Sequence, residues 1–173
     1  TTPVQIFSWE EKASHSLARW AYDGLEAIDG KLYFAGGRKD GTSRDTFESY
    51  DPATNQWTTL PSLNTARGGI SGAVLNNKFY ALGGHGGSDL SSVEIYDPVT
   101  NSWSAGTSLP ITTDHSRAIT WNGKILIFGG EQSGTRHSDV REYDPSTDLW
   151  TSKAPMNTVR AGHHIALHDN KVW

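Results

Sequence analysis

Arginine, histidine and aspartate side chains gather in a few short polar segments of this 173-residue chain. Guanidinium groups bind carboxylates and phosphates in bidentate fashion, while imidazole and carboxylate groups hydrogen-bond, exchange protons or ligate metals. The segments are rich in glycine, serine and threonine, so we expect them on loops, where a rigid scaffold commonly carries binding residues. The predicted ligand-binding face comprises Arg38, Arg44, His85, Asp89, His115, Arg117, Arg136, His137 and His164.

These residues do not form a recognisable catalytic or metal-binding motif. On a strand His163 and His164 point to opposite faces, whereas His164 and His168 share a face but lie about 13 Å apart at strand rise. One ion would therefore need a ligand from another segment, such as His115, whose proximity the sequence does not reveal. The consecutive Asp-His-Ser at 114–116 differs from a catalytic triad, whose members the fold brings together. We predict no catalytic residues, no metal site and no cofactor.

Composition argues against several kinds of partner. The chain has 15 lysines and arginines against 19 aspartates and glutamates, so it lacks the positive field that attracts nucleic acids and anionic membranes. Its longest apolar runs, such as 125–128, are about four residues, against about twenty needed to span a bilayer. We expect neither nucleic-acid nor membrane partners. The absence of cysteine, the few lysines and the abundant small polar residues are compatible with a secreted or cell-surface protein without establishing the compartment.

The scaffold that must position the polar segments is an internal repeat of about 46 residues. Gly-Gly pairs follow short apolar runs at 36–37, 83–84 and 129–130. Tyr-Asp-Pro recurs at 50–52, 96–98 and 143–145, and seven residues after each tyrosine stands a tryptophan, namely Trp57, Trp103 and Trp150. Ten residues after a tryptophan come Arg19, Arg67 and Arg160, but the position after Trp103 holds Thr113.

Each repeat has the pattern of four short strands. In the second repeat, strands at 70–75 and 78–82 flank Asn76-Asn77, and a third strand at 92–96 leads through a turn to Trp103 on the fourth. The corresponding turns are Asp29-Gly30, Asn122-Gly123 and Asp169-Asn170, which are residue types that tolerate positive φ. No segment has a helical pattern, so the sequence predicts an all-β fold.

The spacing of the Gly-Gly, Tyr-Asp-Pro, Trp and Arg elements closely resembles the kelch repeat, the blade of kelch-type β-propellers. The resemblance implies four-stranded antiparallel blades at 20–66, 67–112 and 113–159. Residues 1–19 resemble the last strand of a preceding blade, and 160–173 the opening of a further one. This amounts to about 3.7 blades, whereas propellers close with about four to eight. We therefore expect a partial propeller, which is a fragment of a longer one, one of a non-covalent pair, or an incomplete four-bladed ring. Open sheet edges would then permit self-association.

Function is expected where the repeats differ, because the repeated residues serve the scaffold. The repeated tryptophans should pack between blades, and the repeated arginines should form fixed hydrogen bonds or ion pairs. Antiparallel strands bring the loops after the Gly-Gly pairs (38–45, 85–91 and 131–139) to the same face as the loops that enter the first strands (62–69, 111–117 and 157–164). We predict that this loop face binds a protein, peptide or carbohydrate ligand without catalysing a reaction.

The resemblance also implies an alternative. Kelch-type sialic acid mutarotases are similar, and in such an enzyme Arg117 or an adjacent channel residue would hold a carboxylate while a histidine or glutamate moved a proton. Oxidases that resemble galactose oxidase use copper with a tyrosine crosslinked to cysteine. This sequence has no cysteine to supply that cofactor.

Overall fold

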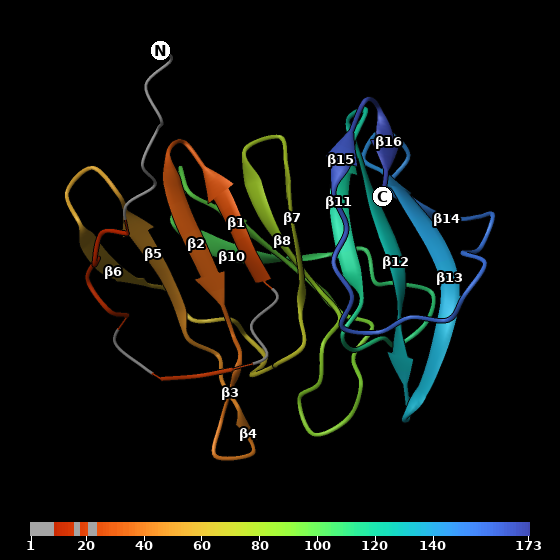
Figure 1. Cartoon of the computed structure of the whole chain (residues 1–173), viewed down its shortest axis with the longest axis horizontal. Coiled ribbons are helices and arrows are strands. Elements are labelled where there is room, and N and C mark those ends of the chain that lie inside the picture. The colour runs from red at the N-terminus through yellow and green to blue at the C-terminus, as the bar shows by residue number, and fades with distance from the viewer. Residues whose placement is uncertain (1–8, 16–17, 21–23) are drawn as a thin grey trace, which may run out of the picture.

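The computed structural model describes residues 9–15, 18–20 and 24–173, and it shows three four-stranded antiparallel sheets side by side (Figure 1). Blade I contains β1 (Gly24–Ile28), β2 (Lys31–Ala35), β5 (Phe47–Asp51) and β6 (Gln56–Leu60). Blade II contains β7 (Ser71–Leu75), β8 (Lys78–Leu82), β9 (Val93–Asp97) and β10 (Ser102–Gly106). Blade III contains β11 (Arg117–Trp121), β12 (Lys124–Gln132), β13 (Thr135–Asp144) and β14 (Leu149–Lys153). The predicted all-β architecture of four-stranded antiparallel blades is confirmed.

Two short hairpins complete the described structure. β3 (Arg38–Lys39) pairs with β4 (Thr42–Ser43) beyond the end of β2, and β15 (Leu167–His168) pairs with β16 (Lys171–Val172) near the C-terminus. The described residues include no helix that is long and apolar enough to cross a membrane.

The predicted turns have the predicted backbone. Asn76 and Asn77 have φ values of 51° and 58°, and Asp29-Gly30, Asn122-Gly123 and Asp169-Asn170 also lie in the left-handed region. The hydroxyl group of each Tyr-Asp-Pro tyrosine donates a hydrogen bond of 2.6–2.8 Å to the side chain of a residue in the following turn. The acceptors are Asn55, Asn101 and Asp148. These acceptors also have positive φ. The repeated tyrosines therefore make the same turn contact in every blade.

The apolar core lies between blades. One cluster joins blades I and II around Phe47, Ile70 and Phe79, which have no exposed surface, and a second joins blades II and III around Leu82 and Ile125. The repeated tryptophans bind the segment that precedes their own blade's sheet through the indole Nε1, which donates to the carbonyl oxygens of Ala13, Pro61 and Thr107 at 2.7–3.0 Å. The predicted position between blades is confirmed for Trp103 and Trp150, which pack against the two clusters. Trp57 packs on Phe34 and Tyr50 of its own blade.

The repeated arginines form buried ion pairs, as predicted, at two of the three positions. Arg19 Nη2 lies 2.9 Å from Glu48 Oε2, and Arg67 Nη2 lies 2.6 Å from Glu94 Oε1. Burial lowers the pKa of Arg67, and the carboxylate of Glu94 acts in the opposite direction. Arg160 is exposed.

Two segments differ from the sequence predictions. The loop expected at 131–139 is instead a hairpin, because β12 and β13 continue past the Gly-Gly pair and turn at Ser133 and Gly134, which have φ values of 50° and 78°. The strand expected near Trp9 is not formed in 9–15, the described part of that region. A strand needs a neighbour to satisfy its backbone, and the contacts of this segment are with the side chains of Asn55 and Trp57. The rest of 1–19 lies largely outside the described residues.

Candidate functional site on the loop face

The loops that enter each blade and the loops that follow each Gly-Gly pair meet on one face, along the lower edge of Figure 1. Antiparallel bridges join them at the same place in each blade: Trp20 with Arg38, Gly68 with His85, and Asp114 with Glu131. The scaffold thus places different residue types at equivalent positions.

A polar cluster forms on this face where blades II and III meet. His85 Nδ1 lies 2.9 Å from Asp89 Oδ1, and the backbone amide of Ser133 donates to Asp89 Oδ2 at 2.6 Å. His115 Nδ1 lies 3.0 Å from Asp114 Oδ1. His85, Asp89 and Asp114 each offer a ligand-type atom within 4.8 Å of the other two. Burial acts to raise the pKa of Asp89, but the hydrogen bonds from His85 and Ser133 hold it below its ordinary value.

Two adjacent glycines hold the cluster together. Gly68 exchanges backbone hydrogen bonds with His85, and the amide of His115 donates to the carbonyl of Gly69 at 3.0 Å. Gly69 has φ of 62°, and a Cβ at this position would collide with the carboxylate of Asp114. His115 itself has φ of 51°, an uncommon conformation for a residue with a side chain. Backbone geometry therefore fixes where the side chains lie.

Next to the cluster, Arg38 and His85 line one groove of about 360 Å³ between the β3–β4 hairpin and residues 85–87. The guanidinium carbon of Arg38 lies 5.8 Å from the ring centroid of Trp20, within the range of a cation–π contact. Ser43 Oγ donates to the carbonyl oxygen of His85 at 2.7 Å, which ties the hairpin to the loop. The groove combines a cation with an imidazole.

The structure thus gathers four of the nine predicted residues, Arg38, His85, Asp89 and His115, into two adjoining features. Asp114 belongs with them and was missed, because the run at 114–116 was tested only as a triad within itself. The sequence signal was the departure from the repeat at this position, which holds Trp20, Gly68 and Asp114 in the three blades.

The other predicted residues lie elsewhere. Arg44 is half-buried, with its backbone hydrogen-bonded to Gly37 and Arg67. Arg136 is exposed and pairs in register with Glu131 near the end of the β12–β13 hairpin. Arg117 is half-buried at the start of β11, whereas His164 is exposed.

His137 is drawn into the junction between blades II and III. Its Nε2 lies 3.3 Å from Thr113 Oγ1, and its Nδ1 lies 3.4 Å from Asp139 Oδ2. Burial lowers the pKa of His137, so the imidazole is less readily protonated than in solution. The His137 side chain is 17% exposed and lies at the junction of blades II and III.

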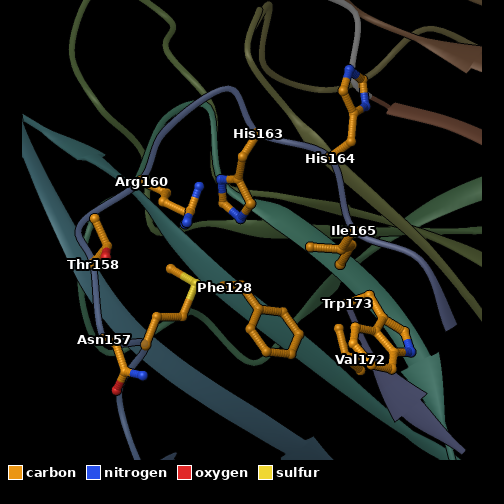
Figure 2. A pocket seen from close by; sticks show the side chains of 10 residues that line it. Phe128, Asn157, Thr158, Arg160, His163, His164, Ile165, Val172 and Trp173 are labelled. Atoms are coloured by element: carbon orange, nitrogen blue, oxygen red, sulfur yellow. The ribbon is translucent and has the colours of Figure 1, made fainter.

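A larger hollow of about 480 Å³ lies beside blade III (Figure 2). Figure 2 shows Arg160, His163 and Ile165 on one side and Phe128 beneath them. Phe128 is the equivalent, in the blade register, of Ala35 and Leu82, both of which are fully buried between blades. On this side of blade III, Phe128 thus occupies the position that is buried between blades at the two described junctions.

Glu26 is a residue of chemical interest that the sequence analysis did not single out. It lies with Val74, Thr120 and Ile165 around a space of about 390 Å³ between the innermost strands. Burial raises its pKa to about 7. The equivalent positions hold Ala73 and Ile119, so the departure from the repeat was the available signal.

Comparison with known proteins agrees with this geometry. The family model described as the Kelch motif matches residues 24–64, 66–110 and 115–157. The chain belongs to the kelch-repeat family.

Among kelch proteins, it is 31% identical over 158 residues to Kelch-like protein 26 of Danio rerio, covering 86% of this chain and 26% of that protein. It is 28% identical over 190 residues to Kelch-like protein 15 of Homo sapiens, covering 95% of this chain and 31% of that protein. The chain therefore spans less than a third of the length of these kelch relatives.

A solved structure, that of YjhT, superimposes on the kelch blades with a TM-score of 0.83, covering 95% of this chain and 61% of that chain. The sequence identity is 22%, so this likeness shows the fold. The three blades and the β15–β16 hairpin accordingly form a partial kelch-type propeller.

Proposed function

We propose that this protein is a non-catalytic interaction scaffold whose loop face binds a protein or peptide ligand. The observation that carries the proposal is the groove between the β3–β4 hairpin and residues 85–87, which Arg38 and His85 line together. The backbone bridges on this face occur at equivalent positions in all three blades, whereas the side chains differ. Kinship with Kelch-like proteins supports an interaction role. Because Arg38 offers a guanidinium fork beside a hydrogen-bonding imidazole, the groove suits an acidic peptide segment.

The test uses a displayed library of random peptides, selected on the purified chain in the presence of a chelator. Peptides that bind this groove should be enriched in Asp and Glu, and Arg38→Ala should weaken their binding at least tenfold with little change in the thermal melt. Lys31→Ala is the matched control, because Lys31 lies at the opposite end of β2 and its side chain is 49% exposed. Equal affinity of the wild type and Arg38→Ala would refute this groove as the binding site.

A second candidate is the carbohydrate-active enzyme, and Glu26 is the observation that favours it. A carboxyl group with a pKa of about 7 in a partly enclosed space has the property required of a general acid or base at neutral pH. In this role Glu26 would move the proton that opens or closes the sugar ring. The interconversion of the anomers of an acidic sugar, followed by NMR with and without the protein, tests it. Acceleration that disappears in Glu26→Gln supports the enzyme, and an unchanged rate excludes it.

A further inference from the structure

We infer that the loop face binds one divalent transition-metal ion where blades II and III meet, with His85, Asp89 and Asp114 as ligands and His115 beside them. The prediction of no metal site rested on spacings within single strands. In the structure the donors come instead from two loops, 85–89 and 114–115, of successive blades. The inference does not depend on the proposed peptide ligand.

The separations of the donor atoms match a coordination sphere. Bonds of about 2.1 Å from an ion to imidazole nitrogen and carboxylate oxygen place neighbouring ligands about 3 Å apart. Two of the three ligand atoms, His85 Nδ1 and Asp89 Oδ1, lie 2.9 Å apart. His115 Nδ1 adjoins the third ligand at 3.0 Å from Asp114 Oδ1. Atoms of His85, Asp89 and Asp114 all lie within 4.8 Å of one another, so one ion can reach all three with small side-chain rotations.

Asp114 supplies independent evidence for a cation. Its side chain is 8% exposed, and Oδ1 is buried without a hydrogen-bond partner. The contact from His115 Nδ1 does not have hydrogen-bond geometry, although the two atoms are close. A buried carboxylate oxygen is costly unless a donor or a metal satisfies it. A cation bound at Asp114 Oδ1 would satisfy this oxygen.

The surrounding backbone holds the donors in place before any ion arrives. The Ser133 amide fixes the second oxygen of Asp89, as outer hydrogen bonds orient the ligands of metal sites. Gly68 and Gly69 bind the loop of His85 and the loop of His115 respectively. Because Gly68 and Gly69 are adjacent, the two halves of the site cannot move apart without breaking these bonds.

The donor types indicate the class of ion. Imidazole nitrogen together with carboxylate oxygen, without thiolate, suits ions such as Zn²⁺ and Mn²⁺, whereas Ca²⁺ and Mg²⁺ favour oxygen alone. Two carboxylates balance the charge of one divalent ion. The side chains of His85 and His115 are 29% and 31% exposed, so the ion can enter from solvent. An exchangeable position would remain for water or an external ligand.

The site belongs to this junction alone among those described between blades. At the junction of blades I and II, the position of His85 is taken by Arg38 and the position of Asp114 by Gly68. A guanidinium does not ligate a metal and glycine has no side chain. The cluster is therefore not part of the repeat.

Titration calorimetry with Zn²⁺ on the intact chain tests the inference. We expect one ion per chain in the wild type, and at least tenfold weaker binding in Asp114→Asn, which preserves the shape of the buried side chain. Asp169→Asn is the matched control: Asp169 lies 3.4 Å from His168 in an exposed His–Asp pair, and asparagine tolerates its left-handed backbone. This control should bind Zn²⁺ as the wild type does.

A second measurement uses only the wild type and tests the inference even if Asp114→Asn fails to fold. Substoichiometric Mn²⁺ should broaden the NMR signals of the His85 and His115 rings selectively in the wild type, leaving those of His168 sharp. Absence of Zn²⁺ binding, equal binding by Asp114→Asn, preferential binding of Ca²⁺, or broadening at His168 instead would each overturn the inference. Peptide selection in chelator is unaffected by this result, so failure of the metal site and failure of the proposed function are distinguishable.

Discussion

The two described blade junctions have the same backbone arrangement but differ in their buried polar side chains. The first junction joins blades I and II, and the second joins blades II and III. At the first, Arg67 is fully buried and donates hydrogen bonds to Glu94, to the Gly83 carbonyl and to Ser92. At the second, the equivalent of Arg67 is Thr113, and the equivalent of Glu94 is Arg141.

The difference separates the scaffold from the candidate site. The first junction repeats the pattern of Arg19 with Glu48, and its loop face presents the Arg38 groove. At the second junction, Thr113, His137 and Arg141 lie where the ion pair would be. The loop face of this junction carries the cluster of histidines and aspartates. Departures from the repeat occur together at one junction, inside it and on its surface.

The largest expected effect is at the first junction. Arg67→Ala leaves Glu94 buried without its cation, so we expect a loss of about 3–5 kcal/mol in the free energy of unfolding. Urea denaturation followed by fluorescence measures it. A loss below about 1 kcal/mol would show that the pair does not hold the junction.

Restoring the repeat at the second junction gives the next largest effect. Thr113→Arg places a buried cation near Arg141, and we expect a loss of about 2–4 kcal/mol. Adding Arg141→Glu creates the missing pair and should recover at least half of that loss. A double-mutant cycle by urea denaturation measures the coupling. Additive losses would mean that the two junctions do not share one geometry.

Glu26, which lies between the innermost strands, should make the stability of the fold depend on pH. Since burial raises its pKa from 4.5 to about 7, the folded chain retains a proton that the unfolded chain has lost in this range. The contribution of Glu26 to the free energy of unfolding is therefore greatest below pH 4.5, and it falls as pH rises toward about 7. Glu26→Gln should remove this slope and gain about 1–3 kcal/mol above the range. Parallel pH profiles of denaturation midpoints for wild type and variant would contradict the assignment.

The smallest expected effect lies at the outer strand of blade III. Lys153 Nζ lies 3.0 Å from Glu142 Oε1, but its side chain is 44% exposed and Lys124 contacts the same oxygen. We expect Lys153→Ala to cost less than about 1 kcal/mol in a thermal melt. A loss as large as that of Arg67→Ala would show that the outer strand contributes as much to the free energy of unfolding as the junctions do.

The sequence predicts the frame well because the repeated residues recur at fixed spacings, so that one blade assignment accounts for all of them. Asn76-Asn77 and its equivalents require positive φ, and the tryptophans and arginines recur at fixed distances. The hairpin at 131–139 was not predicted, because continuation of a ladder past a Gly-Gly pair depends on pairing and not on composition.

The site was only partly predictable for a related reason. His85, Asp89 and His115 could be selected as polar departures from the repeat, but their convergence depends on Gly68 and Gly69 joining two loops. Glu26 escaped notice because its importance comes from burial between blades, which a spacing argument does not measure. The sequence predicts His137 on the loop face, and its contact with Thr113 at the blade junction depends on tertiary structure.

The tryptophan hydrogen bonds have a consequence for measurement. Trp103 reaches back to Pro61 and Trp150 to Thr107, so each indole senses the segment that feeds its own blade. A chain that keeps Trp103 alone would report by fluorescence on the first junction, and one that keeps Trp150 alone would report on the second. The protein thus contains an optical probe for each junction, and the order in which the blades separate can be observed directly.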